Sequence, residues 1–382
     1  MPHRKSQIRN HKYHKSQNFM GFDQFHGNRE VVDQLRGMLA RDRFPHAVIL
    51  AGPQGSGKYT LAQMLAKAKN CINRAAGEAP DFCGKCANCI RIAEADDLEA
   101  RCAAAVEARE SLRDTDKKET RIFVQTHPDV LIIPPDPPQM MIKVDQVRHV
   151  IQSIYYRPSE GGRRVYIFPS AAFMKEAANS LLKVLEEPPD FATLFLLAEN
   201  PGQLLATIRS RCVTFRLCPL ETAEIESDLA RLHPEWKPAQ RALVAKLSEG
   251  AVGRARCFDL AAYTAARQDA LVLLTTAINA EDHTALFRAT ETYRAGAEGR
   301  EKTDHLLRTL YSLLEDMMFL KSGTAELVRN TDISGELKRL AEAVDFAWIA
   351  AAAQKVGEVE SGMRRNLLRS LSLDAMVAGL EK

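Results

Sequence analysis

The sequence lacks any uninterrupted apolar run close to the roughly 20 residues that a membrane-spanning helix requires. The first twenty residues are basic, but they have neither the apolar core nor the small-residue cleavage site of a secretion signal. The membrane-spanning and secreted classes are therefore excluded, and we expect a cytoplasmic protein. What remains is ordinary for a globular protein, with 46% hydrophobic and 26% charged residues, and 382 residues predict two or three domains.

A strong excess of either charge is also absent from the body of the chain. The net charge of +3 comes from the N-terminal segment, which holds five basic residues and no acid: Arg4, Lys5, Arg9, Lys12 and Lys15. Without these five, 47 basic residues face 49 acidic ones, so charge alone does not indicate tight DNA binding. We expect residues 1–20 to be a disordered or wrongly assigned extension, with Met20 the true start, and a DNA-contacting arm is the alternative.

The hydrophobic pattern predicts an α/β part followed by a helical part. A helix with apolar residues on one stripe begins near Phe22, and the helical signal returns after a glycine-rich turn at 52–57. Strands are expected at 47–51, 129–133, 164–168, 194–198 and 213–217, and helices at 144–156, 171–187 and 201–208. Strands that alternate with helices predict a parallel sheet with helix-covered faces.

Strand signals stop after Pro219, which sets the expected domain boundaries. The predicted α/β domain covers 21–218 and contains a cysteine module at 71–89 and an inserted, mostly exposed helical segment at 91–120. A small helical domain is expected at 219–262 and a helical bundle at 263–382.

Residues 52–60 contain a glycine-rich loop between a predicted strand and a predicted helix, as a phosphate-binding loop requires. Gly52, Gly55 and Gly57 would let backbone N–H groups cradle phosphate oxygens, and Lys58 would reach the outer phosphates. Magnesium binding usually needs Ser or Thr directly after the lysine, but Tyr59 stands there and Thr60 comes one residue late. The sequence therefore indicates a degenerate nucleotide site, and a loop that only turns the chain, with no nucleotide bound, is the alternative.

The acidic pair that holds magnesium and activates water in P-loop ATPases is missing as well. The corresponding apolar strand, Val165–Phe168, is followed by Pro169 and Ser170, and the next acid downstream is Glu176, inside a predicted helix. Without a magnesium hydroxyl and without these acids, the reacting phosphate would be neither neutralised nor aligned. We therefore predict no intrinsic ATPase and regard ATP and Mg²⁺ binding as doubtful.

Four of the eight cysteines lie within nineteen residues, at Cys71, Cys83, Cys86 and Cys89. In a cytoplasmic protein this spacing indicates metal rather than disulfides. Four thiolates complete a tetrahedral zinc shell with no open position, so the predicted Zn²⁺ is structural. The alternative is a group of four reduced thiols without a metal.

The segment Ser-Arg-Cys places Arg211 just before the last predicted strand, at the expected sheet edge. An arginine at this position can reach a neighbouring subunit and stabilise charge on its γ-phosphate. Without further information, a surface arginine in a salt bridge is the simpler interpretation.

Together these residues resemble the clamp-loader branch of the AAA+ ATPases. The resemblance covers most of residues 22–256 and is carried by several stretches: FDQFHGNREVVDQL, HAVILAGPQGSGK, CGKCANC, THPDV, IKVDQVR, EAANSLLKVLEEPP, LLATIRSRC and GAVGRAR. It implies an AAA+ P-loop core with a parallel sheet, a small helical lid and a helical collar for oligomerisation. Two departures are the eleven residues between Cys71 and Cys83 and the insertion at 91–120.

The family contains two similar kinds of subunit in bacterial DNA polymerase III. Gamma/tau motor subunits keep the magnesium hydroxyl and the acidic pair, whereas delta-prime subunits have the same fold with those residues degraded. Tyr59, Pro169 and Ser170 place the chain with the delta-prime kind. The resemblance then implies that Arg211 acts in trans as an arginine finger, and that Arg254 corresponds to a lid arginine of doubtful role.

The partners implied by this resemblance are gamma/tau motor subunits and a delta subunit in one ring. That ring places a sliding clamp on primer–template DNA within the replicative DNA polymerase. Two alternatives stay open: an ATP-hydrolysing motor subunit with an unusual site, and an AAA+-derived nucleic-acid-binding adaptor outside replication.

Overall fold

The computed structural model describes residues 21–73, 81–160, 162–279, 283–293, 296–363 and 368–380. The expectation for residues 1–20 therefore lies outside the described residues. The chain separates into two compact units, of which the first is Met1–Glu221 with Gly250–Arg254 and the second is Thr222–Glu249 with Ala255–Lys382. Among the described residues, no helix is both long enough and apolar enough to cross a membrane.

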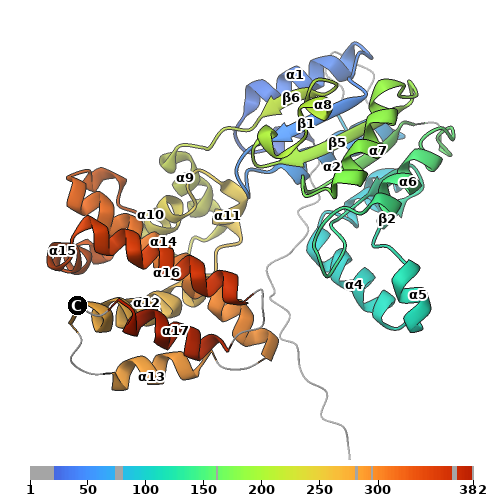
Figure 1. Cartoon of the computed structure of the whole chain (residues 1–382). Coiled ribbons are helices and arrows are strands. Elements are labelled where there is room, and N and C mark those ends of the chain that lie inside the picture. The colour runs from blue at the N-terminus through green and yellow to red at the C-terminus, as the bar shows by residue number, and fades with distance from the viewer. Residues whose placement is uncertain are drawn as a thin grey trace, which may run out of the picture. The chain divides into compact units, whose positions relative to one another are not determined.

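The first unit is built on a six-stranded sheet with the order β2-β3-β4-β5-β1-β6 (Figure 1). The strands are β1 (Ala47–Ala51), β2 (Val124–His127), β3 (Val130–Ile132), β4 (Arg164–Phe168), β5 (Ala192–Ala198) and β6 (Val213–Arg216). All neighbouring pairs are parallel except β2 and β3. The predicted fold class, a P-loop α/β core with a parallel sheet followed by helices, is confirmed, but the antiparallel edge strand β2 was not predicted.

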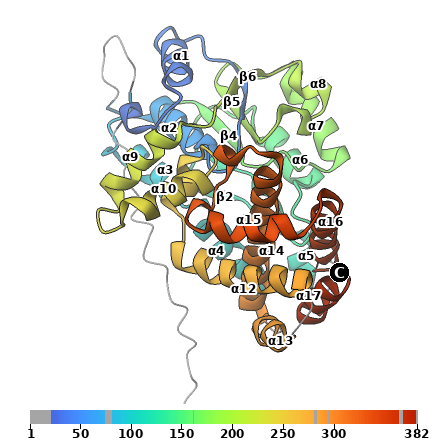
Figure 2. The ribbon, with the colours of Figure 1, turned by 90° about the vertical axis from the view of Figure 1, so that its left-hand side faces the viewer.

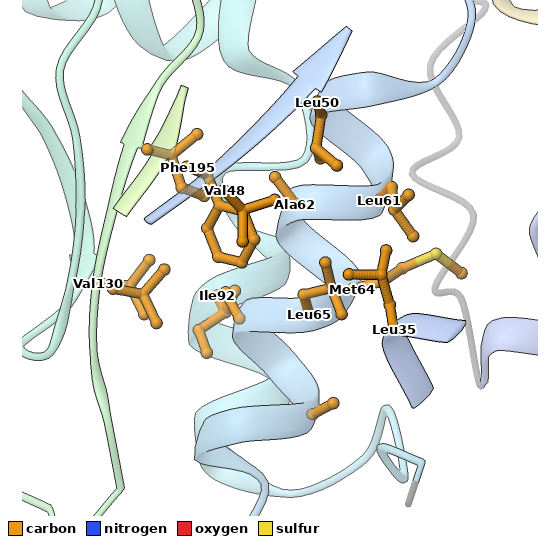
Figure 3. Close-up of a cluster of buried hydrophobic side chains, with 14 of the residues drawn as sticks. Leu35, Val48, Leu50, Leu61, Ala62, Met64, Leu65, Ile92, Val130 and Phe195 are labelled. Atoms are coloured by element: carbon orange, nitrogen blue, oxygen red, sulfur yellow. The ribbon is translucent and has the colours of Figure 1, made fainter. Parts of the chain in front are cut away.

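Alternation along β1 explains why helices cover both faces of the sheet. Val48 and Leu50 belong to one apolar cluster, with residues of α1 (Arg29–Ala40) and α2 (Lys58–Asn70), as Figure 3 shows. Ala47, Ile49 and Ala51 belong to the opposite cluster, with residues of α6 (Val144–Ser153) and α7 (Lys175–Glu186). Because successive side chains of a strand point to opposite faces, a fully apolar strand needs a helical layer on each side.

Several element boundaries differ from the predicted ones. The helix expected at 171–187 begins only at Lys175, because the preceding residues pair with Ile142 through Ile142 N to Ala172 O at 2.7 Å and Met174 N to Ile142 O at 3.0 Å. The expected helix 201–208 divides into the 3₁₀ helix η2 (Pro201–Gln203) and α8 (Ala206–Arg209). Before α1, a short 3₁₀ helix, η1, covers Phe22–Gln24.

The inserted segment lies beside β2 and forms the end of α3 (Ala87–Ala93), then α4 (Leu98–Glu110) and α5 (Asp114–Glu119). Most of α4 is exposed, in agreement with its weak apolar pattern, but Arg109 is buried. Its Nη1 atom donates to Asp136 Oδ1 at 2.8 Å, and Lys143 Nζ lies 2.7 Å from the other oxygen of the same carboxylate. This buried ion pair attaches α4 to the core.

The second unit contains only helices among its described residues. They are α9 (Thr222–Leu232), α10 (Pro238–Leu247), the end of α11 (Val252–Arg256), α12 (Leu260–Asn279), α13 (Thr284–Glu291), α14 (Gly296–Ser322), η3 (Ala325–Leu327), η4 (Thr331–Ile333), α15 (Ser334–Ala343), α16 (Phe346–Met363) and α17 (Arg369–Ala378), several of them labelled in Figure 2. Leucines at helical spacing on α14 are buried in the apolar cluster of this unit. The helical character expected after Pro219 is therefore confirmed.

Candidate functional site

The glycine-rich loop between β1 and α2 has the backbone that a phosphate-binding loop needs. Gly55 and Gly57 have φ values of 83° and 88°, a left-handed conformation that other residues adopt only with strain. A Cβ atom on Gly55 would lie 2.9 Å from Arg254 N, and Gly253 N donates to Gly55 O at 2.8 Å. The backbone at 253–254 therefore packs directly on the loop and leaves no room for a side chain there.

Lys58 contacts the carbonyl groups of its own loop. Its Nζ atom donates to Gly52 O at 2.6 Å and to Pro53 O at 2.7 Å. Burial lowers the pKa of Lys58, and the negative charge of Glu199 opposes this effect. Glu199 directly follows β5, the strand beside β1, and the sequence analysis missed it because the strand order was unknown.

Tyr59 points its hydroxyl into the packing between α2 and the turn after α3. The hydroxyl donates to Ala95 O at 2.5 Å and accepts from Gln63 Nε2 at 2.6 Å. Burial raises the pKa of Tyr59 and keeps the phenol neutral. Both the ring and its hydroxyl are committed to internal contacts, so Tyr59 supplies no magnesium ligand at the loop.

The end of β4 carries no carboxylate. Phe168 is buried, and after Pro169 the Ser170 hydroxyl oxygen accepts from Ala172 N at 3.1 Å. Glu176 lies in the first turn of α7 and is exposed. The structure therefore brings Lys58 and the glycines together with Glu199, but not with an acidic pair on β4.

The four cysteines expected to bind metal lie together, with their sulfur atoms all within 4.8 Å of one another. Cys71 Sγ is 3.6 Å from Cys83 Sγ and 3.9 Å from Cys86 Sγ. Zinc–sulfur bonds of about 2.3 Å in a tetrahedron would separate the sulfurs by about 3.8 Å. These separations are far too long for disulfides and fit four ligands of one ion, so the cluster could hold a metal.

Backbone groups donate hydrogen bonds to some of the cysteine sulfur atoms, although burial raises the pKa of Cys71 and Cys89. Cys83 Sγ accepts from Lys85 N at 3.4 Å and from Cys86 N at 3.3 Å, in a turn that Gly84 makes possible with a φ of 67°. Burial raises the pKa of Cys86, but hydrogen bonds from the backbone of Cys89 and Ile72 outweigh it and lower the pKa to about 6. Hydrogen bonds to the sulfurs are a common second layer around a metal site.

Arg211 lies between α8 and β6, at one edge of the sheet, as predicted. Its Nη2 atom donates to Glu186 Oε1 at 2.7 Å, and its Nη1 atom donates to Thr207 O at 3.0 Å. About a third of the Arg211 side chain and half of the Glu186 side chain are exposed. The guanidinium group is therefore held by its own chain at a surface where another molecule could compete for it.

Taken together, the glycine-rich loop between β1 and α2 of a mostly parallel sheet defines a P-loop protein. Residues 27–221, just over half of the chain, match the family described as DNA polymerase III, delta subunit. The chain belongs to this family.

The chain is also similar to individual curated proteins and to a solved structure. The chain is 34% identical over 202 residues to DNA polymerase III subunit delta' of Pseudomonas aeruginosa, covering 52% of this chain and 51% of that protein. It is 26% identical over 325 residues to subunit tau/gamma of Haemophilus influenzae, covering 83% of this chain and 37% of that protein. A solved gamma-subunit-related protein of Thermotoga maritima aligns over 91% of this chain and 98% of its own, at 17% identity and a TM-score of 0.36. The chain thus spans about half the length, or less, of these two curated relatives.

Proposed function

We propose that this chain is a delta-prime-type subunit of a bacterial DNA polymerase III clamp loader. In this role it would assist ATP-dependent loading of a sliding clamp onto primed DNA without hydrolysing ATP itself. Its partners would be gamma/tau motor subunits and a delta subunit. Relatives named subunit delta' from Pseudomonas aeruginosa and Bacillus subtilis, at 34% and 30% identity, support the assignment.

The observation that carries the proposal is the position of Tyr59. Tyr59 occupies the position where a magnesium-binding hydroxyl is required, but its own hydroxyl donates to Ala95 O. The end of β4 has Pro169 and Ser170 where an acidic pair is required. Gly52, Gly55, Gly57, Lys58, Thr60 and Arg254 would then bind a nucleotide without turnover or form a vestigial loop. In either case the chain would contribute to the hydrolysis of ATP that is bound to another subunit.

Arg211 is our candidate for the residue that acts on ATP bound to a neighbouring subunit. Its ion pair with Glu186 is partly exposed, so the pair contributes little stability and a more concentrated negative charge can displace the carboxylate. A neighbouring γ-phosphate offers such a charge, and an arginine can bind it in bidentate geometry. Arg211 would then stabilise the transition state of hydrolysis in the next subunit.

The cysteine cluster would hold a structural Zn²⁺ through Cys71, Cys83, Cys86 and Cys89. The ion would offset half of the charge of the four thiolates and fasten the end of α2 to the start of α3. Four cysteines fill the coordination sphere, so the ion would have no open position for a substrate.

We further propose that the chain has three domains, of which the second is a helical lid at 219–262 and the third is a helical collar at 263–382.

An ATP-hydrolysing motor subunit is the second candidate. It is favoured by the 26% identity to the Haemophilus influenzae tau/gamma subunit over 325 residues, and by Glu199 beside the loop lysine. A nucleic-acid-binding adaptor outside replication is a weaker alternative. It would require salt-sensitive DNA binding by the isolated chain and no recovery of motor and delta subunits in a pull-down.

The test is an Arg211→Ala variant in a complex reconstituted with the motor and delta subunits of the same organism. We expect the complex to assemble normally while its DNA-stimulated ATPase falls by at least about tenfold, as loss of an arginine finger predicts. Arg148→Ala, which removes an exposed arginine of α6, is the matched control and should leave the rate unchanged. An unchanged rate with Arg211→Ala would remove the arginine-finger role.

A further inference from the structure

The two edge strands of the sheet differ in which elements lie against them. The β2 edge contacts α3 and α4, whereas β6, at the opposite end of the strand order, pairs only with β1 among the described residues. An uncovered edge strand presents unpaired N–H and C=O groups to which another strand can add. Proteins usually cover or distort such edges, so an open one deserves a functional explanation.

The hydrogen bonds of β6 identify which groups are free. Leu217 N donates to Ala51 O at 2.7 Å, so the odd-numbered residues of this segment turn their backbone groups toward β1. Because backbone groups alternate in direction along a parallel strand, those of Thr214 and Arg216 point away from β1. Thr214 and Arg216 therefore offer donors and acceptors at the spacing that an added strand needs.

A groove with a volume of about 650 Å³ runs along this edge. Three consecutive residues of β6, Thr214 to Arg216, line it, which means that it faces the strand edge rather than one face of the sheet. Val31 of α1 and Ala206 of α8 add apolar surface to its walls. Extended peptides bind in this way, with backbone hydrogen bonds for affinity and side-chain pockets for specificity.

Two arginines give the groove its charge. Arg209 and Arg216 line it and are exposed, and within the described ranges neither makes an ion pair or a side-chain hydrogen bond. This contrasts with Arg211, which is held by Glu186. In the part of the chain that the structure describes, no acidic side chain lines the groove. Its surface therefore favours a negatively charged ligand.

We propose that β6 and this groove bind an extended, acidic segment of a partner protein by strand addition. The segment would exchange backbone hydrogen bonds with Thr214 and Arg216 and place carboxylates against the guanidinium groups of Arg209 and Arg216. The chain's own residues 1–20 do not suit the groove, because they carry five basic residues and no acid. A second copy paired through β6 would bring like charges of Arg216 together, which is unfavourable.

The test uses the full chain and two fluorescein-labelled hexapeptides, Val-Glu-Val-Glu-Val-Thr and Val-Lys-Val-Lys-Val-Thr, in a fluorescence anisotropy titration. We expect the glutamate peptide to bind and the lysine peptide to bind at least tenfold more weakly. Arg209→Glu together with Arg216→Glu should abolish the preference. Arg148→Glu on α6 changes charge equally at an exposed site and should leave binding unchanged.

A second variant tests strand addition without altering charge. Thr214→Pro removes an outward N–H group that makes no bond to β1, and circular dichroism can verify that the variant folds. We expect it to weaken binding of the glutamate peptide at least tenfold. The proposal is overturned by equal binding of both peptides, by undiminished binding to Thr214→Pro, or by no binding of the glutamate peptide at 1 mM. Tighter binding of a thymidine oligonucleotide than of either peptide would overturn it too, because it would identify a nucleic-acid surface. None of these outcomes depends on Arg211.

Discussion

At the scale of single residues, Arg109 provides a prediction about stability. It forms a buried ion pair with Asp136, and removing one partner leaves the carboxylate only partly compensated by Lys143. We expect Arg109→Ala to lower the free energy of unfolding by about 3 kcal/mol in urea denaturation. Arg101→Ala on the same helix breaks an exposed pair with Glu94 and should cost less than about 1 kcal/mol. Equal effects of the two variants would contradict the anchoring role of Arg109.

The sequence could predict part of the candidate site. The loss of magnesium binding through Tyr59 stays a prediction, and the structure shows that the Tyr59 hydroxyl donates to Ala95 O and accepts from Gln63 Nε2. Glu199 could not be found from the sequence, because it approaches Lys58 only through the adjacency of β5 and β1. Residues that are close in the sequence can be related by their spacing, whereas a contact that depends on strand order requires the fold.

His127 predicts a pH dependence. It is buried at the end of β2, its Nδ1 accepts from Asp129 N at 3.1 Å, and burial lowers its pKa although Glu160 opposes this. The unfolded chain, with a histidine pKa of about 6.5, therefore takes up a proton more readily than the folded chain. Above about pH 6.5, His127 is neutral in both states and its burial does not lower the free energy of unfolding. As the pH falls below this value, the unfolded chain gains a proton first, and the free energy of unfolding decreases.

The variant His127→Asn isolates this effect. Its side-chain oxygen can still accept from Asp129 N but does not titrate. We expect the unfolding free energy of the wild type to fall more steeply between pH 7 and pH 5.5 than that of the variant, in denaturation curves at matched ionic strength. Parallel curves for the two proteins would show that His127 does not contribute.

At the scale of elements, five of the six described strands were predicted, because four of them are short and mostly apolar runs and β6 alternates apolar and polar residues. β2 was missed because its four residues, VQTH, contain only one strongly apolar side chain and join β3 through a two-residue turn without a crossover helix. The insertion at 91–120 was predicted to be helical and exposed, but its attachment to Asp136 depends on a contact between residues 27 apart. The local sequence pattern therefore predicts whether a segment is a helix or a strand. The residues by which that segment is attached to the core can be identified only from the tertiary fold.

The cysteine module predicts an element-scale response to loss of metal. Zinc binding to a structural site is worth on the order of 10 kcal/mol, and each ligand contributes to it. We expect the purified chain to contain about one zinc per molecule, and Cys86→Ser to lose most of it in elemental analysis and to melt at a lower temperature. Cys218→Ser alters an exposed cysteine outside the cluster and should change neither property. A wild-type protein with well under one zinc and four freely titrating thiols would refute the site.

At the scale of the whole molecule, the proposed function makes this chain one subunit of an assembly. Mixing the chain with the motor and delta subunits should give one complex in size-exclusion chromatography. Its formation should not depend on Lys58, because that lysine is bonded to its own loop carbonyls at 2.6 and 2.7 Å. Loss of assembly in Lys58→Ala, with the variant still folded, would indicate that bound nucleotide organises the interface.

The central claim is that this chain cannot turn over ATP by itself, because neither Tyr59 nor the end of β4 holds magnesium at its loop. The most direct measurement is steady-state ATP hydrolysis by the purified chain with Mg²⁺ and no partner proteins, beside Lys58→Ala. We predict the same background rate for both proteins. Magnesium-dependent turnover that Lys58→Ala abolishes would contradict the account and favour a motor subunit.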